Sequence, residues 1–412
     1  MDNVFDFRNR LINEYSSFSR SFSKVSAQDI LSKVELEYDR GRYWPEPLIQ
    51  INPNYKRQST VQQLAHEGML HASCSHIFQT GKTEGKAADL HLYVHQLQAL
   101  AKAQKQQSYV VTTGTGSGKS LAFFVPIIDR ILKAKQADPQ KRTRAIVIYP
   151  MNALANSQLE ELDKFLHGYP DDQKPFTVAR YTGQESDADR KQIADNPPDI
   201  LLTNFMMLEL ILTRFEDVDR RVVEHCQGLE FLVLDELHTY RGRQGADVAL
   251  LVRRLRERLQ ASQLVCIGTS ATMSSTGTQA DRNQTVASVA SLLFGAQITE
   301  HDVIGETLER VTNPAKDIEA VKSLLKPALL KESYHWPDFA AFSDDPLAVW
   351  VELSLGIELP LNEPPRRARP VTLGDAAKRL ADDAQCTVEE AHAGLQRFLV
   401  AAHDVKTPQG RA

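Results

Sequence analysis

Short apolar runs alternate with longer segments of helical periodicity through the middle of the chain. From about residue 91 to 300 these runs are four to seven residues long, rich in β-branched residues, and followed by polar or glycine-bearing turns. They are YVVTT (109–113), AIVIYP (145–150), FTVARYT (176–182), DILLT (199–203), FLVLD (231–235) and LVCIGTS (264–270). Nearly continuous apolar character is typical of parallel strands that are buried on both faces. The pattern predicts an α/β fold in which a parallel sheet is flanked by helices.

The two ends of the chain lack this alternation. The amino-terminal part is mostly helical in pattern, except for YWPEPLIQINPNY, whose prolines forbid a continuous helix. Near the other end, residues 371–404 predict two amphipathic helices about a turn at Gln385, with a capping box from Thr387 to Glu390. This helix pair is either a helix-turn-helix reader of DNA or a packing or linker subdomain. The predicted parts are an N-terminal helical accessory region (1–90), the α/β domain (91–304) and a helical insertion or linker (305–412).

Composition sets the class of protein without fixing its partners. The 412 residues suffice for two or three domains, and 42% hydrophobic with 25% charged residues is ordinary for a soluble globular protein. No apolar run approaches the ~18 residues of a membrane span, and the polar start MDNVFDFRNR lacks a signal-peptide core. We therefore expect a cytoplasmic protein with no membrane partner. The four cysteines form no C-x-x-C pair, which argues against a zinc ribbon or a disulfide framework.

The stretch TTGTGSGKS (112–120) follows one apolar run and precedes a helical segment. A triphosphate needs many N–H donors at short range, and Gly114, Gly116 and Gly118 let the backbone approach it closely. A helix that starts near Lys119 directs its free N–H groups toward the phosphates. Lys119 would contact the β and γ phosphates, and the Ser120 hydroxyl would hold Mg²⁺. The predicted nucleotide contacts in this loop are Thr115, Gly116, Ser117, Gly118, Lys119 and Ser120.

One position departs from the strict phosphate-loop pattern G-x-x-x-x-G-K-[ST]. Thr113 stands where the pattern has its first glycine. A glycine-rich turn without a ligand is the alternative interpretation of the loop. The strand before it and the helix after it favour the nucleotide site.

Two adjacent carboxylates end the run FLVLD. Asp235 and Glu236 lie at the carboxyl end of a predicted strand, the edge at which ligands bind to open α/β sheets. One carboxylate can orient Mg²⁺ while the next accepts a proton from an attacking water. We assign Asp235 to the metal and Glu236 to the general base. The sequence therefore predicts ATP and Mg²⁺ as cofactors, with Lys119, Asp235 and Glu236 as the catalytic groups.

Together with the phosphate loop, DELH (235–238) resembles motif II of the DEAD/DEAH-box group in helicase superfamily 2. Further segments resemble the other motifs of this group, in family order over about 180 residues. They are LYVHQLQAL (92–100) for the adenine-reading segment, YPMNALANSQ (149–158), YTGQ (181–184) and TNFMMLE (203–209) for motifs Ia, Ib and Ic, and GTSATM (268–273) for motif III. The resemblance implies a RecA-like P-loop NTPase fold and ATP hydrolysis coupled to the opening of nucleic acid.

Within the superfamily the chain more closely resembles bacterial DNA helicases of the mitomycin-repair type and their large phage-defence relatives. The segments YPMNALANSQ, TNFMMLE and LDELHTYRGRQGADVALLVRRLR carry this likeness. The run YWPEPLIQINPNY resembles a leader of the larger members. The implied partners are single-stranded or forked DNA and the proteins of a defence or repair complex.

The resemblance also implies roles for single residues. Gln96 would read adenine, and His238, Ser270 and Thr272 would couple the γ-phosphate site to the nucleic-acid track. Arg241 would meet DNA phosphate. The residues implied to hold sugar-phosphate, through backbone and short polar groups, are Asn152, Thr182, Gly183, Thr203 and Asn204. Such contacts give register without reading sequence.

Helicases of this group close two RecA-like domains on ATP, and the second domain supplies an arginine. After residue 300 the sequence shows no second-domain signature such as Q-x-x-G-R-x-G-R. We therefore expect an amino-terminal portion of a longer helicase, which alone hydrolyses ATP slowly or not at all. Two alternatives stay open at this point: an RNA helicase, and a module that scaffolds a defence or repair complex with nucleotide as its switch.

Overall fold

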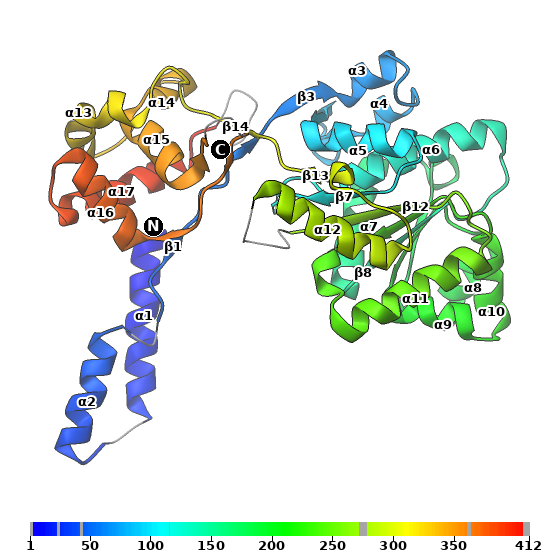
Figure 1. Ribbon diagram of the computed structural model, residues 1–412, viewed down its shortest axis with the longest axis horizontal. Coiled ribbons are helices and arrows are strands. Elements are labelled where there is room, and N and C mark those ends of the chain that lie inside the picture. Colours follow the sequence, from blue (N-terminus) through cyan, green and yellow to red (C-terminus); the bar gives the residue numbers. More distant parts are fainter. Residues whose placement is uncertain are drawn as a thin grey trace. The chain divides into compact units, whose positions relative to one another are not determined.

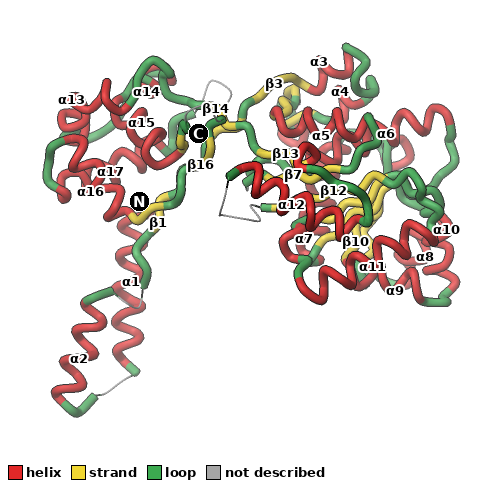
Figure 2. Tube along the Cα trace, viewed as in Figure 1, coloured by secondary structure: helices red, strands yellow, loops and turns green. Residues whose placement is uncertain are grey.

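The computed structural model describes residues 3–22, 25–41, 44–114, 116–271, 278–360 and 364–406. The chain forms two compact units. One comprises residues 55–307, and the other joins 1–54 to 308–412. Figure 1 labels their elements, and Figure 2 distinguishes helices, strands and loops.

A seven-stranded parallel sheet forms the centre of the unit 55–307. Its strand order is β13-β7-β12-β11-β8-β10-β9. The strands are β7 (Tyr109–Thr112), β8 (Ala145–Tyr149), β9 (Val178–Tyr181), β10 (Ile200–Asn204), β11 (Phe231–Leu234), β12 (Val265–Ser270) and β13 (Val303–Gly305). The six apolar runs of the sequence all form strands, so the predicted α/β fold with a RecA-like parallel sheet is confirmed. The seventh strand, β13, adds to the edge beside β7.

Helices cover both faces of this sheet. Successive side chains of a strand point to opposite faces, so Val147 packs into one core while Ile146 and Ile148 pack into the other. The first core is covered by α3 (Val61–His66), α4 (Cys74–Ile77), α5 (Val94–Gln104), α6 (Leu121–Ala137) and α7 (Asn152–Leu166). The second is covered by α8 (Asp187–Asp195), α9 (Phe205–Thr213), α10 (Asp217–His225), α11 (Gly242–Arg258) and α12 (Gln279–Phe294). Residues 55–90 belong to this unit, because α3 and α4 pack into its first core.

Smaller elements complete the unit. They are the antiparallel pairs β3 (Arg57–Thr60) with β6 (His91–Tyr93) and β4 (Gln79–Thr80) with β5 (Ala88–Asp89), and the 3₁₀ turns η1 (Lys82–Glu84), η2 (Asp171–Gln173), η3 (Leu237–Thr239) and η4 (Glu300–Asp302).

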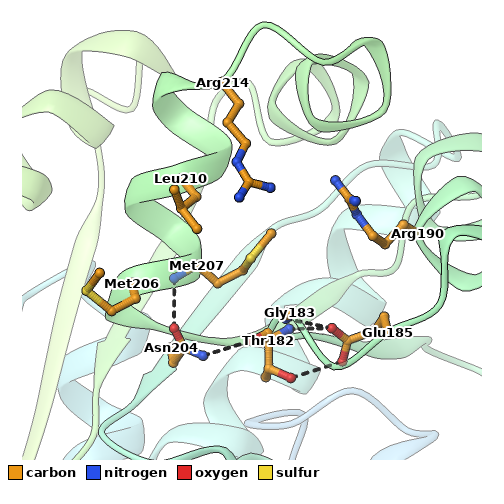
Figure 3. A pocket seen from close by; sticks show the side chains of 9 residues that line it. All are labelled: Thr182, Gly183, Glu185, Arg190, Asn204, Met206, Met207, Leu210 and Arg214. Atoms are coloured by element: carbon orange, nitrogen blue, oxygen red, sulfur yellow. Dashed lines mark hydrogen bonds between the residues drawn. The ribbon is translucent and has the colours of Figure 1, made fainter.

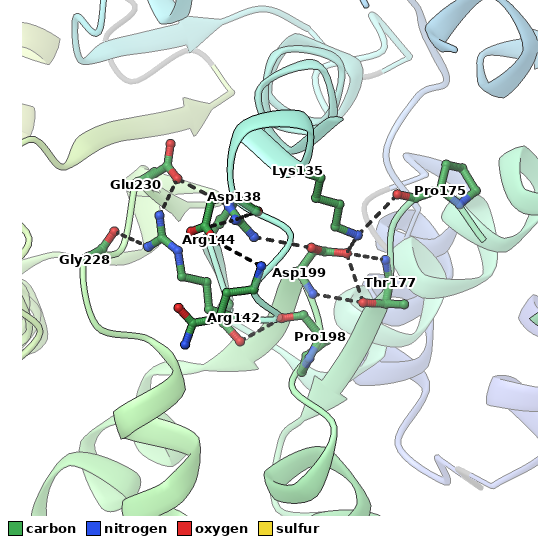
Figure 4. A network of polar contacts seen from close by, with 12 residues as sticks. Lys135, Asp138, Arg142, Arg144, Pro175, Thr177, Pro198, Asp199, Gly228 and Glu230 are labelled. Atoms are coloured by element: carbon green, nitrogen blue, oxygen red, sulfur yellow. Dashed lines mark hydrogen bonds and ion pairs between the residues drawn. The ribbon is translucent and has the colours of Figure 1, made fainter. Parts of the chain in front are cut away.

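A buried arginine organises the amino ends of the central strands (Figure 4). Arg144 precedes β8 and is fully buried, with its guanidinium 3.5 Å from a Glu230 carboxylate oxygen and 3.8 Å from one of Asp199. Asp199 also accepts hydrogen bonds from Lys135 Nζ at 2.6 Å and from the Thr177 amide at 2.8 Å. Burying these charges is tolerable because each is paired. In parallel sheets, ligands bind at the carboxyl ends of the strands. This network lies at the opposite edge.

The unit formed by 1–54 and 308–412 is mainly helical. Its core contains the fully buried Trp350, whose indole donates to Asp383 at 2.8 Å. The predicted helix pair is confirmed as α16 and α17, with Gln385 left-handed between them and Thr387 in the expected capping box with Glu390. Its helices are α1 (Val4–Ser21), α2 (Gln28–Asp39), α13 (Ile318–Leu329), α14 (Phe339–Ser343), α15 (Pro346–Val351), the π-helical η5 (Glu352–Gly356), α16 (Leu373–Ala384) and α17 (Val388–Ala402). Short strands are β1 (Leu48–Ile49), β14 (Leu308–Glu309), β15 (Ile357–Glu358), β16 (Arg366–Arg367) and β17 (Val371–Thr372), and β2 (Asn54–Tyr55) lies at the boundary of the units.

Helical content is high in both units, yet no helix in the described ranges has both the length and the apolar character that crossing a bilayer requires.

Candidate functional site

The glycine-bearing loop joins β7 to α6 at the carboxyl edge of the sheet. Gly116 and Gly118 adopt φ values of +77° and +67°, a left-handed conformation that favours glycine. A Cβ at Gly118 would also lie 2.7 Å from the Gln96 side-chain nitrogen. Helix α6 begins directly after Ser120, so its first N–H groups face the loop. Thr115 lies outside the described residues.

Thr113, which replaces the expected first glycine, has a supporting role in the loop. Its side chain is buried, and its hydroxyl lies 2.6 Å from the Ser117 hydroxyl. This hydrogen bond joins the two ends of the turn. Where the strict pattern has a flexible glycine, Thr113 thus supplies a side-chain hydrogen bond to Ser117.

Two residues in the first turn of α5 contact the loop through its backbone carbonyls. Gln96 donates from its amide nitrogen to the Gly118 carbonyl at 2.8 Å and accepts from the Tyr93 amide at 2.8 Å. His95 is fully buried, and its Nε2 lies 3.0 Å from the Ser117 carbonyl. Burial lowers the pKa of His95, which favours the neutral ring. The Gln96 side chain therefore joins the N-terminus of α5 to the loop.

The acidic pair follows β11, one strand removed from β7, with β12 between them. Asp235 accepts a hydrogen bond from the hydroxyl of Thr269, and the same hydroxyl accepts from the Glu236 amide at 3.1 Å. Glu236 has a φ of +54°, which turns its side chain out of the strand direction. Burial raises the pKa of Asp235, while the Thr269 hydrogen bond opposes that shift. Thr269 therefore contacts the Asp235 carboxylate and the Glu236 backbone from the neighbouring strand.

Lys119 brings the loop and the acidic pair together. Its Nζ lies 3.7 Å from a Glu236 carboxylate oxygen. The other Glu236 oxygen lies 3.2 Å from His238 Nδ1, and that nitrogen is 3.3 Å from the Ser270 hydroxyl. The predicted residues Lys119, Asp235, Glu236, His238 and Ser270 thus meet at one edge of the sheet. Thr272 lies outside the described residues.

The site has the properties that a metal-bound triphosphate requires. The Lys119 ammonium is buried and makes no hydrogen bond to any of the described residues. Leaving a buried cation without an acceptor is costly, so the position suits an incoming anion. Carboxylate and hydroxyl oxygens from Asp235 and Ser120 are the ligand type that Mg²⁺ prefers. The residues present therefore fit Mg-ATP.

The residues expected to hold sugar-phosphate lie close together and bond to one another. Asn204 donates to Asn152 Oδ1 at 2.7 Å and to the Thr182 carbonyl at 3.0 Å. The Thr203 hydroxyl donates to the Tyr181 carbonyl at 2.6 Å. These bonds fix the ends of β9 and β10 relative to α7. The side chains of Thr203 and Asn204 thus bond to other groups of the protein.

Glu185 completes this region (Figure 3). Its carboxylate accepts from the amides of Thr182, Gly183 and Gln184 at 2.7, 2.9 and 3.1 Å. Burial opposes the charge of Glu185, but hydrogen bonds from the Thr182 amide, the Arg180 guanidinium and the Thr182 hydroxyl outweigh it and hold its pKa below the usual range. The turn therefore already has an anion bound to its N–H groups.

A pocket of about 290 Å³ opens beside this turn. Figure 3 shows the guanidinium groups of Arg190 and Arg214 on one side and Met206 and Leu210 on another. Its lining residues are Thr182, Gly183, Glu185, Arg190, Asn204, Met206, Met207, Leu210 and Arg214.

Arg241 makes no hydrogen bond or ion pair that joins it to these groups among the described residues. It caps α11 from an exposed position just after η3. Sequence reasoning did not identify Thr269, Glu185 or His95. Thr269 sits in the same strand-end segment as Ser270, so the rule that selected Ser270 also applies to it.

The fold and this site define a RecA-like P-loop NTPase domain. Residues 93–280 match the model of the DEAD/DEAH box helicase family.

Similar proteins include ATP-dependent helicases of bacteria. The chain is 35% identical over 184 residues to the uncharacterized ATP-dependent helicase YprA of Bacillus subtilis, covering 44% of this chain and 23% of YprA. It is 32% identical over 186 residues to the Lhr helicase/uracil glycosylase of Escherichia coli, covering 42% and 12%. A crystal structure of the DUF1998 helicase MrfA bound to DNA aligns over 69% of this chain and 35% of its own, with 24% identity and a TM-score of 0.48. The chain thus spans less than a quarter of the two curated relatives.

Proposed function

We propose that the chain is the first motor domain of a larger ATP-dependent DNA helicase or translocase, which binds Mg-ATP and the backbone of single-stranded DNA. The observation that carries this proposal is the buried Lys119 ammonium, which makes no hydrogen bond to the described residues and lies 3.7 Å from the Glu236 carboxylate at the carboxyl edge of the sheet. The names of YprA and Lhr as helicases support the assignment of the motor class.

Each residue at this edge has a task in the proposed mechanism. Lys119 would neutralise phosphate charge, and Ser120 with Asp235 would hold the metal ion. When bound, Mg²⁺ would polarise the phosphate oxygens and neutralise the charge that develops on them. Glu236 orients the attacking water and accepts its proton. In the same proposal Gln96 contacts adenine after it exchanges one of its present hydrogen bonds.

The proposed coupling to the nucleic-acid track is a series of side-chain contacts. His238 lies 3.2 Å from Glu236 and 3.3 Å from Ser270. Thr272 would continue this series. A change at the γ-phosphate position thereby reaches the end of β12. Asn152, Thr182, Gly183, Thr203 and Asn204 form the proposed track, and Arg241 would add a phosphate contact.

We infer that this chain alone turns over ATP slowly. The described residues form one large sheet, that of a single motor domain. In related enzymes, an arginine supplied to the γ-phosphate by a second domain raises the rate of hydrolysis by about 10³-fold or more. Steady-state ATPase assays with and without single-stranded DNA test the inference. Robust DNA-stimulated turnover by the 412-residue chain would refute it.

The substrate class is tested separately. Competition binding with single-stranded DNA, RNA and duplex DNA should rank single-stranded DNA first, whereas preference for RNA would select an RNA helicase. Glu236→Gln provides the control for a scaffold, because a scaffold retains its protein partners when hydrolysis is blocked and a motor loses its function.

The wider role belongs to the same proposal. We propose that the parent protein acts in the cytoplasm, in phage defence or DNA repair, because its motifs resemble those of the mitomycin-repair and phage-defence helicases. Deleting the gene and exposing cells to mitomycin C and to phage tests this role. Survival equal to that of the parent strain under both challenges would reject it.

A further inference from the structure

An acidic side chain reaches the phosphate loop from the edge strand of the sheet. Strand β13 pairs in parallel with β7, with Gly305 opposite Thr112. The next residue, Glu306, therefore emerges beside the start of the loop. Its carboxylate oxygen Oε2 accepts a hydrogen bond from the Gly114 amide at 3.2 Å. Neither the motifs nor the proposed mechanism uses this residue.

The position of this carboxylate conflicts with nucleotide binding. The loop functions by presenting backbone N–H groups to phosphate oxygens, and Gly114 carries one of the first such groups. A single N–H donor does not serve a carboxylate and a phosphate at full strength together. Two anions at one turn also repel each other in a partly buried site, where screening by water is weak.

The residues around Glu306 connect it to the rest of the site. The carbonyl of the following residue, Thr307, accepts from the Lys56 amide at 2.9 Å, and the Lys56 carbonyl accepts from the Val94 amide at 3.0 Å. Val94 is the first residue of α5, whose first turn holds the loop through His95. Backbone hydrogen bonds therefore connect the residue after Glu306 to the first turn of α5, which contacts the loop through His95 and Gln96.

We propose that Glu306 is an internal competitor of the nucleotide phosphates. Its carboxylate accepts the Gly114 N–H and leaves when a phosphate takes that donor. This inference rests on the proposed nucleotide site and adds a residue that lowers its affinity. Glu306 thus sets the concentration at which nucleotide fills the site.

Substitutions at Glu306 separate its charge from its shape. Glu306→Gln retains an acceptor for Gly114 but removes the charge, and Glu306→Ala removes both. We expect ADP to bind about tenfold more tightly to Glu306→Gln, which corresponds to about 1.4 kcal/mol. Glu306→Ala should bind ADP at least as tightly as Glu306→Gln.

The experiment is an equilibrium titration of the full 412-residue chain with the fluorescent nucleotide mant-ADP, in the presence of Mg²⁺. Displacement by pyrophosphate and by adenosine shows which part of the nucleotide responds. The gain should appear with pyrophosphate and be absent with adenosine, because only phosphate competes for Gly114. Glu300→Gln is the matched control, since it removes an exposed carboxylate from the turn before the same strand.

Lys119→Ala separates failure of this inference from failure of the nucleotide site. Binding by the wild type, loss in Lys119→Ala and unchanged or weaker binding in Glu306→Gln would overturn the inference and leave the site intact. A wild type that does not bind mant-ADP would overturn both. A gain with adenosine equal to that with pyrophosphate would show a general change in the loop and would also overturn the inference. Circular dichroism of each variant verifies that it folds.

Discussion

Thr269 is the residue whose removal should reveal how the acidic pair is held. It is fully buried in β12, and its hydroxyl donates to Asp235 and accepts from the Glu236 amide. Thr269→Val keeps the branched shape and removes the hydroxyl alone. The change removes the Thr269 hydroxyl as an acceptor for the Glu236 amide and as a donor to the Asp235 carboxylate.

The magnitude follows from these two groups. A buried amide that loses its acceptor costs about 1–3 kcal/mol, and a hydrogen bond to a charged group contributes about 1.5–3 kcal/mol. Because the two bonds share one hydroxyl and Asp235 can take up a proton in response, the costs do not simply add. We expect Thr269→Val to lower the free energy of unfolding of the sheet unit by about 2–4 kcal/mol. Thr269→Ser, which loses only a methyl group, should cost about 1 kcal/mol.

Urea denaturation without metal measures this difference, provided that the two units are followed separately. All three tryptophans (Trp44, Trp336 and Trp350) lie in the unit formed by 1–54 and 308–412. Hydrogen exchange of peptides from β11 and β12 therefore reports the sheet unit, and tryptophan fluorescence serves as an internal control that should not change. Equal unfolding free energies for Thr269→Val and Thr269→Ser would refute the role assigned to this hydroxyl.

Two further substitutions test the packing around the site and the anion in the turn after β9. Gly268→Ala would place a Cβ 2.3 Å from the Leu237 side chain, so we expect a loss of about 1–3 kcal/mol and a lower melting temperature; wild-type stability would contradict this close contact. Glu185→Gln should destabilise the sheet unit by about 1–3 kcal/mol at pH 7. Because the folded-state pKa of Glu185 is lowered, its contribution is present above the ordinary carboxyl pKa and is lost as the pH falls through the folded value. The difference between Glu185→Gln and wild type, measured by urea denaturation across this range, should vanish in acid, and a constant difference would show that its charge is irrelevant.

The sheet was accessible from sequence because its strands carry a strong local signal. All six apolar runs became strands whose bounds lie within two residues of the predicted ones. Strand β13 has only three residues, too few for a periodic pattern, so it was not anticipated. The carboxyl edge brought Lys119 and Glu236 together as expected, because in parallel strands all carboxyl ends meet at one edge.

Contacts that depend on the path of a turn were not accessible in the same way. Nothing in the local sequence indicates that Glu185 curls back onto three amides, or that Glu306 reaches Gly114 across 192 residues. The resemblance gave Asn204 as a contact to nucleic acid, whereas the structure shows which protein groups it bonds. Motifs therefore identify which residues lie together, and the structure shows the hydrogen-bond partners of each.

The dependence of ATP binding on Mg²⁺ tests the central claim most directly, namely that Lys119, Asp235 and Glu236 surround one metal-bound triphosphate. Isothermal titration of the wild type and of Asp235→Asn with ATP, in excess Mg²⁺ and in EDTA, gives four affinities. We predict that Mg²⁺ tightens ATP binding to the wild type and that Asp235→Asn loses most of this gain while it still binds ATP in EDTA. A gain from Mg²⁺ that is the same in both proteins would contradict the claim.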